Sequence, residues 1–126
     1  RSEAPEGQME TDYIPGTSLF VRKDVIDQIG LLDEDFFMYS EDLDWSLRAR
    51  KAGYSLVYFS STVLLHDTPY GKTSDRPSLK RIWFKYKNYF RGVHLIVRKH
   101  FTFWEKVVWY VKLPFSLVFT FIYEVV

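Results

Sequence analysis

The chain of 126 residues is long enough for one domain or for part of one, and its 47% hydrophobic content allows a packed core. It contains no cysteine, which excludes a disulfide framework and a thiolate zinc site. The net charge of +1 hides an asymmetry, because residues 1–71 carry 6 Lys/Arg and 13 Asp/Glu whereas residues 72–126 carry 11 and 3. We therefore expect the second part to meet an anionic surface.

The first part of the chain contains short elements separated by turn residues. Residues 1–12 are polar and are expected to form a loop. Residues 17–22 follow a Pro-Gly turn signal and predict a strand. A short helix over residues 24–29 is expected to stop at Gly30. The acidic and aromatic residues 31–39 are expected to be irregular.

A second helix is predicted over residues 41–52. Ser40 is its expected N-cap and Gly53 its stop. Acidic residues fill its first turn and basic residues its last, an order that the helix dipole favours. Residues 55–59 and 62–66 then predict two short strands or one interrupted strand.

The last part of the chain is basic and aromatic. After a loop, apolar residues recur at a spacing of four and three that predicts an amphipathic helix: Ile82, Tyr86, Tyr89, Val93 and Ile96. A second stripe of the same helix is basic: Lys80, Lys87, Arg91 and Arg98. Residues 113–123 are uncharged, but a membrane-spanning helix needs about 20 apolar residues. We expect either an interfacial segment or a truncated span. Because the chain begins at Arg1 and ends on an apolar run, we also expect a fragment.

Three carboxylates crowd the start of the second helix, in the stretch Ser40-Glu41-Asp42-Leu43-Asp44-Trp45. A structural explanation is available, because acidic residues suit a first helical turn and Asp44 can pair with Arg48 four residues later. The functional explanation is that one carboxylate acts as a general base, which must reach the proton that it removes. The residues alone leave both explanations open.

His66 ends an apolar run and precedes Asp67. Ligands of α/β proteins bind at the carboxyl ends of strands, and His66 lies at such a position. A lone histidine can equally be a satisfied polar residue, so a metal-ligand role is one of two interpretations.

Taken together, these stretches keep a characteristic order along the chain: Tyr13–Lys23, Ile29–Phe37, Glu41–Trp45, Leu47–Arg50, Ala52–Tyr54 and His66. This order resembles the second half of glycosyltransferase family 2, especially its bacterial rhamnosyltransferase-like members. The resemblance is dense from Asp12 to His66 and has a weaker echo in residues 86–89. It implies an α/β fold, namely the C-terminal part of a GT-A mixed sheet flanked by helices, followed by amphipathic and apolar helices.

The resemblance also assigns roles to individual residues. It implies an inverting displacement in which Asp42, the second carboxylate of the pair with Glu41, takes the proton from the acceptor hydroxyl. Gly16 and Thr17 match the loop that lines the donor-sugar and acceptor pocket. Trp45 matches a residue near the acceptor.

A divalent metal, Mn²⁺ or Mg²⁺, is implied on the donor diphosphate, with His66 completing its coordination. The other ligands would come from an Asp-x-Asp motif in the family's N-terminal half, which is absent from this sequence. Residues 33–35 have the letters of that motif, but they match an acidic loop after a helix and are not assigned to metal. We expect this chain alone to be inactive.

The resulting organisation has two parts, with the acceptor side of the catalytic domain in residues 1–76 and a membrane-associating segment in residues 77–126. The expected partners are a nucleotide-sugar donor, a glycan or lipid-linked acceptor and an anionic membrane surface, at the cytoplasmic face of the cell membrane. No nucleic-acid-binding motif is present, so nucleic acid is not expected. The alternative function is a non-catalytic membrane-docking or scaffold fragment. A glycoside hydrolase is disfavoured, because adjacent carboxylates do not reliably flank a sugar.

Overall fold

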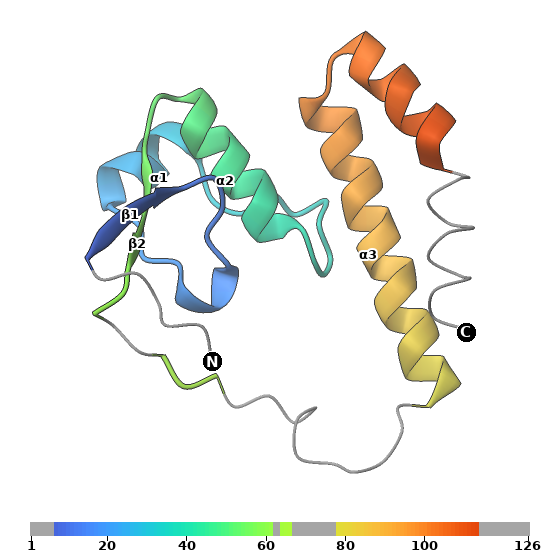
Figure 1. Ribbon diagram of the computed structural model, residues 1–126, viewed down its shortest axis with the longest axis horizontal. Coiled ribbons are helices and arrows are strands. Elements are labelled where there is room, and N and C mark those ends of the chain that lie inside the picture. Colours follow the sequence, from blue (N-terminus) through green and yellow to red (C-terminus); the bar gives the residue numbers. More distant parts are fainter. Residues whose placement is uncertain (1–6, 62–63, 67–77, 114–126) are drawn as a thin grey trace.

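The computed structural model describes residues 7–61, 64–66 and 78–113. Its elements in chain order are strand β1 (Gln8–Thr11), 3₁₀ helix η1 (Gly16–Ser18), α1 (Lys23–Ile29), α2 (Glu41–Lys51), β2 (Leu56–Phe59) and α3 (Leu79–His100). A further helical segment covers residues 103–113. The architecture is mixed α/β, as expected for the C-terminal part of a GT-A domain. In Figure 1, β1, β2, α1 and α2 form one group, and α3 runs beside it.

The sheet of the described residues has two antiparallel strands, β1 and β2. Gln8 pairs with Phe59 at one end and Thr11 with Leu56 at the other. The expectation of a loop over residues 1–12 is therefore wrong for residues 8–11. This stretch has little strand pattern of its own, but pairing with β2 satisfies those of its backbone N–H and C=O groups that face β2.

The expected strand over residues 17–22 is also wrong. The chain turns through η1, where the Ser18 amide donates to the Pro15 carbonyl at 3.1 Å, and the following residues make no strand ladder among the described residues. Leu19 and Val21 pack against the core. A short apolar run after a turn signal fits a strand, but Leu19 and Val21 reach the core from an extended segment that pairs with no described strand.

Helices α1 and α2 enclose the first hydrophobic core, made of Val25, Trp45, Ala49 and Leu56. The short first helix is confirmed. It ends at Gly30, whose positive φ of 81° suits a residue without a Cβ. The Gly30 carbonyl accepts a hydrogen bond of 3.0 Å from the Trp45 indole, which fixes α1 against α2.

Ser40 stands at the N-cap of α2 as expected, but its side chain makes no capping hydrogen bond. Both Tyr39 and Ser40 have positive φ values, of 67° and 72°. Gly92 of α3 lies against them, because a Cβ on Gly92 would come within 2.7 Å of the Tyr39 carbonyl oxygen. The two residues with left-handed backbone, Tyr39 and Ser40, are therefore the ones that pack closely against Gly92 of α3.

Of the two predicted strands, residues 55–59 are confirmed as β2. Residues 62–63 of the second lie outside the described residues, and residues 64–66 are not in a strand. The sheet therefore ends before His66.

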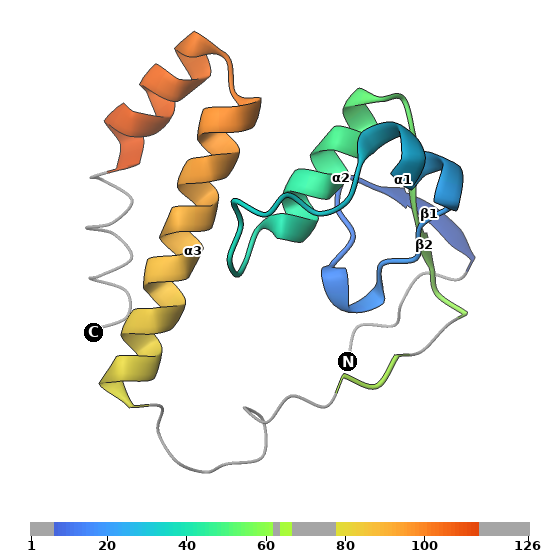
Figure 2. The same ribbon diagram turned by 180° about the vertical axis from the view of Figure 1, so that it is seen from behind.

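Helix α3 is confirmed, but its buried face differs from the predicted stripe. Ile82 and Tyr89 are exposed. The buried residues are Asn88, Gly92, Leu95, Ile96 and Val97. The reason is that α3 has two neighbours: the loop before α2 on one side, and the segment 103–113, which folds back along α3 in both views (Figures 1 and 2). The predicted basic stripe, by contrast, is exposed along its whole length.

Among the described residues, none of the helices combines the length and the hydrophobicity that a membrane span requires.

Candidate active site

Asp42 lies in the first turn of α2, where its carboxylate is fixed by three hydrogen-bond donors. Its Oδ2 accepts from the Tyr13 hydroxyl at 2.6 Å and from the Gly16 amide at 2.9 Å. Its Oδ1 accepts from the Leu43 amide at 2.8 Å. A carboxylate offers about four lone-pair directions, so one direction is left for a further donor.

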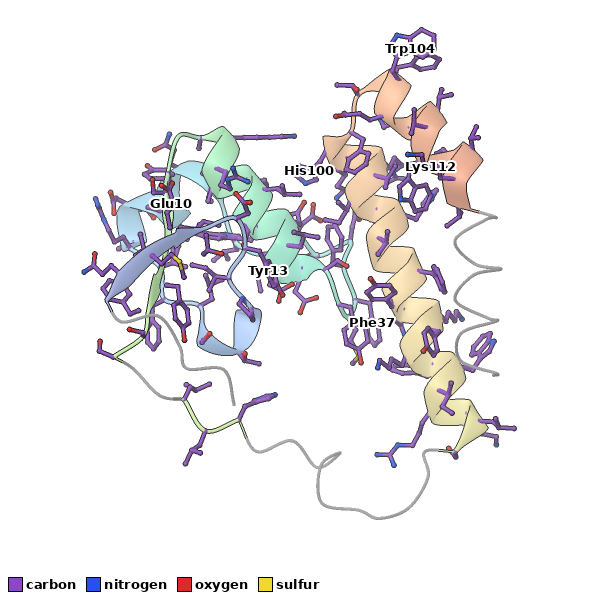
Figure 3. All side chains as sticks on the ribbon, in the orientation of Figure 1. Glu10, Tyr13, Phe37, His100, Trp104 and Lys112 are labelled. Carbon is purple, nitrogen blue, oxygen red and sulfur yellow. The ribbon has the colours of Figure 1, made fainter. Side chains whose placement is uncertain are left out.

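Tyr13 approaches Asp42 from the segment before η1, and Figure 3 shows its position at the start of α2. Partial burial raises the pKa of the Tyr13 phenol, as do the hydrogen bond to Asp42 and the charges of Asp42 and Glu41. The phenol is therefore protonated at neutral pH and acts as a donor. The sequence predictions missed this residue, which is 29 positions from its partner.

Gly16 and Thr17, the predicted pocket residues, both lie in η1. The structure brings Gly16 directly against Asp42: a Cβ on Gly16 would lie 3.5 Å from the Asp42 Cβ, an ordinary contact distance. Thr17 is the next residue and is exposed. Two of the predicted site residues, Gly16 and Asp42, are thus in contact.

Glu41 precedes Asp42 on α2 and is partly buried. Within the described residues, its Oε2 is buried and has no hydrogen-bond partner. A buried carboxylate oxygen calls for a donor, and the hydroxyl groups of a sugar are such donors.

A cavity of about 510 Å³ lies between the segment around η1 and β2. Ligand sites typically have volumes of roughly 300–1,000 Å³. Tyr13 connects this cavity to Asp42, because it lines the cavity while its hydroxyl reaches the carboxylate. The other residues that line the cavity are largely apolar: Thr11, Ile14, Pro15, Ser18, Phe20, Val57, Tyr58, Phe59 and Leu64.

Neither Trp45 nor His66 is among the residues that line this cavity. Trp45 is 4% exposed and packs in the first core, so its acceptor-contact role stays a prediction. His66 is exposed in the short described segment after β2. Among the residues that the structure describes, no group of three or more potential ligands could hold a metal ion. His66 therefore fits at most a single-ligand contribution to a shared site.

The acidic loop before α2 is ion-paired to α3. Asp33 and Asp35 both pair with Lys99 of α3, and the Lys99–Asp35 distance is 2.6 Å. Lys99 also lies 5.4 Å from the centre of the Phe36 ring.

The third carboxylate of the acidic stretch, Asp44, is 1% exposed and belongs to a buried network. It accepts from Arg48 Nε at 2.8 Å, which confirms the predicted pair, and its Oδ1 lies 2.7 Å from His100 Nε2. Lys51 Nζ lies 3.1 Å from His100 Nδ1. Since an ammonium can only donate, Nδ1 accepts and Nε2–H donates to Asp44. The sequence predictions missed His100.

The ion pairs from α3 to Asp33, Asp35 and Asp44 cross the predicted boundary between residues 76 and 77. The division into two parts stays a prediction.

Comparison with known proteins places these features in a family. The model of glycosyl transferase family group 2 matches residues 7–126. The chain belongs to this family. The resemblance inferred from the sequence is thereby confirmed, and the match includes Tyr13, Asp42 and α3.

Two relatives illustrate the relationship. The chain is 38% identical over 77 residues to N-acetylglucosaminyl-diphospho-decaprenol L-rhamnosyltransferase of Mycobacterium tuberculosis (strain H37Rv), a match covering 61% of this chain and 24% of the relative. It is 27% identical over 88 residues to low-salt glycan biosynthesis hexosyltransferase Agl10 of Haloferax volcanii, a match covering 70% of this chain and 28% of that relative. The chain thus spans about a quarter of the length of the curated relatives that it matches. No solved structure matches it significantly.

Proposed function

We propose that this chain supplies the acceptor side of the active site of an inverting glycosyltransferase. The parent enzyme would transfer a hexosyl or rhamnosyl unit from a nucleotide-sugar to a hydroxyl group. Family membership and the names of the two relatives support glycosyl transfer. The observation that carries the proposal is the Asp42 carboxylate, held at the start of α2 by Tyr13 and Gly16.

In the proposed reaction Asp42 is the general base. The acceptor hydroxyl donates to the remaining lone pair of the carboxylate and attacks the anomeric carbon of the donor sugar. The acceptor O–H bond breaks and its proton passes to Asp42, while the bond from the anomeric carbon to the nucleoside diphosphate breaks. Attack from the face opposite the leaving group inverts the configuration. Such a base contributes typically 10²–10⁴-fold to the rate.

We propose a lipid-linked glycan as the acceptor. The name of the mycobacterial relative includes a diphospho-decaprenol substrate, and this supports the same class of acceptor here. Such an acceptor would bring the reaction to the cytoplasmic face of the cell membrane, where nucleotide-sugar and lipid meet.

The proposal extends to a divalent cation, Mn²⁺ or Mg²⁺, which when bound neutralises charge on the leaving diphosphate. His66 would contribute one ligand, and the remaining ligands would come from an Asp-x-Asp motif outside this chain. Its test is the metal dependence of His66→Ala in the full-length protein: an unchanged metal requirement and rate would remove His66 from the site.

The decisive experiment replaces Asp42 with Asn in the full-length protein. An amide oxygen in the place of Oδ2 can still accept from Tyr13 and Gly16, while the amide NH₂ in the place of Oδ1 can no longer accept from the Leu43 amide. Two of the three hydrogen bonds are therefore kept while the basicity is lost. We expect transfer to fall by about 10²–10⁴-fold, with binding of the nucleotide-sugar unchanged by calorimetry. The matched control is Asp12→Asn, an exposed carboxylate that pairs with Arg50 and should leave transfer unchanged.

The same three hydrogen bonds also fit a scaffold in which Asp42 only ties the loop to α2. A scaffold predicts no transfer in the wild-type protein. An enzyme that uses another base predicts full turnover in Asp42→Asn. Either result would contradict the proposal.

A further inference from the structure

The helical segment 103–113 has an apolar stripe whose side chains are exposed. Its members are Phe103, Trp104, Val107, Val108 and Val111, and their exposed fractions are 70%, 73%, 38%, 50% and 61%. At 100° per residue they share one face of the helix. Figure 3 shows Trp104 projecting away from α3. This face is too apolar to be left to water without a function.

The opposite face of the same segment is anchored to α3, so the stripe has a fixed direction. Lys106 and Trp109 are partly buried, and Tyr110 bonds His94 Nδ1 through its hydroxyl at 3.0 Å. The start is fixed by a capping box: the Glu105 carboxylate accepts from the Thr102 amide at 2.7 Å, and the Glu105 amide donates to the Thr102 hydroxyl at 3.5 Å. Rotation of the stripe toward α3 would break these contacts.

The charge around the stripe is strongly positive. Residues 78–113 contain nine Lys/Arg and a single Asp/Glu. On α3, Lys80, Lys87, Arg91 and Arg98 are exposed along one stripe. Lys80, Arg91 and Arg98 make no ion pair with any described residue, and Lys87 lies over the Trp83 ring at 4.9 Å. These cations are therefore available to an anionic partner.

The charged side chains of the segment decide between crossing a bilayer and lying on it. Glu105, Lys106 and Lys112 lie beside the apolar stripe, so the described segment is apolar on one face and not all round, whereas a membrane-spanning helix is predominantly apolar. A helix with one apolar face, aromatic residues and flanking cations lies in the interface, with the apolar face among the acyl chains. A second copy of the chain is a poor partner, because two such basic surfaces repel each other.

We propose that the stripe Phe103–Val111 inserts into the interface of an anionic lipid bilayer, with the basic stripe of α3 facing the headgroups. The inference goes beyond the proposed transfer reaction and does not rest on it, because it concerns binding alone. It separates two contributions: apolar insertion by the segment 103–113, and electrostatic attraction by α3.

The test is flotation of the full chain with vesicles of phosphatidylcholine alone and of phosphatidylcholine mixed with phosphatidylglycerol. We expect binding to the mixed vesicles that weakens at high salt. The double variant Trp104→Ser/Val108→Ser should lower the partition coefficient about a hundredfold, at roughly tenfold for each lost apolar side chain. Both side chains are exposed, so the fold should be kept, and circular dichroism checks this.

Matched controls lie in the α/β part of the chain. Phe20 is 85% exposed, and Phe20→Ser should leave the partition within twofold. Arg91→Ser and Arg98→Ser should each lower binding to the mixed vesicles about fivefold, without effect on neutral vesicles. Lys23→Ser should have no effect.

Three outcomes would overturn the proposal. They are the absence of wild-type binding to the mixed vesicles, equal binding by Trp104→Ser/Val108→Ser, and loss of self-association in that variant with vesicle binding unchanged. The last outcome, measured by sedimentation, would make the stripe an interface between protein copies.

Discussion

His100 at the end of α3 donates to Asp44 near the start of α2, with 2.7 Å between Nε2 and Oδ1. Both side chains are buried, at 7% and 1% exposure. Asp44 lies two residues after Asp42, so this contact connects the proposed base helix to the basic, aromatic part of the chain. Figure 3 shows His100 on the side of α3 that faces α2. The position of the base helix thus depends on α3.

Replacing His100 with Ala should therefore destabilise the protein. Asp44 would keep Arg48 as a partner but would lose one donor in a buried site, at a cost of about 1–3 kcal/mol. The measurement is urea unfolding at pH 7. His94→Ala is the control: this histidine is exposed and bonds the exposed Tyr110, so its loss should cost less. Equal losses of unfolding free energy in the two variants would show that the His100–Asp44 hydrogen bond stabilises the protein no more than the exposed His94–Tyr110 hydrogen bond does.

Gly92→Ala should also destabilise, although alanine is normally the better helix former by about 1 kcal/mol. The added Cβ would come within 2.7 Å of the Tyr39 carbonyl oxygen, which is backbone and cannot rotate away. Overpacking of this kind typically costs 1–3 kcal/mol. Gly16→Ala is the control for stability, since its Cβ finds ordinary contacts starting at 3.5 Å and should change the unfolding free energy little. A stabilised Gly92→Ala protein would refute the close packing.

Local signals explain which elements the sequence predicts. The helices have periodic apolar residues and a glycine stop, as at Gly30, and these depend only on neighbouring residues. Strand β1 has no such signal, because its partner β2 lies more than forty positions away. The Pro15-Gly16 turn signal followed by the apolar run Leu19-Phe20-Val21 predicts a strand. A short apolar run does not distinguish strand pairing from core packing by an extended segment.

The residues of the candidate site are likewise only partly predictable from the sequence. The resemblance pointed to Gly16 and Asp42, and the structure places them in contact. Tyr13 and His100 were missed because their partners lie 29 and 56 positions away. A tyrosine or a histidine with a distant partner has no spacing that a single sequence can reveal.

Lys99→Met should release the acidic loop from α3. The pKa of Asp33 is lowered mainly by its hydrogen bond to Lys99, and that of Lys99 is raised by Asp33 and Asp35. Both side chains of the Lys99–Asp33 pair are about a quarter exposed, so we expect a loss of only about 1 kcal/mol at pH 7. Denaturant unfolding of the two proteins measures it.

The pH dependence of this loss has a definite sign. A carboxylate with a lowered folded pKa stabilises above its unfolded pKa of about 4, and the contribution disappears as the pH falls through the folded pKa. The gap between wild type and Lys99→Met should therefore close in acid. Lys23→Met, which removes an exposed pair with Asp27, serves as the control with a smaller effect. If the stability difference between wild type and Lys99→Met persists undiminished in strong acid, the ion pairs of Lys99 with Asp33 and Asp35 are not its cause.

Tyr13→Phe removes one donor from the Asp42 carboxylate and should cost about 1 kcal/mol at neutral pH. Because the folded pKa of Tyr13 is raised, the bound form is the neutral phenol. The unfolded phenol ionises near pH 10, so ionisation favours the unfolded state above that value. The stability advantage of the wild type over Tyr13→Phe should be complete below pH 10 and should diminish as the pH rises further. Tyr58→Phe, at an exposed position on β2, should show no advantage at any pH. An advantage that grows in alkali would mean that the phenolate, and not the phenol, is the form bound beside Asp42.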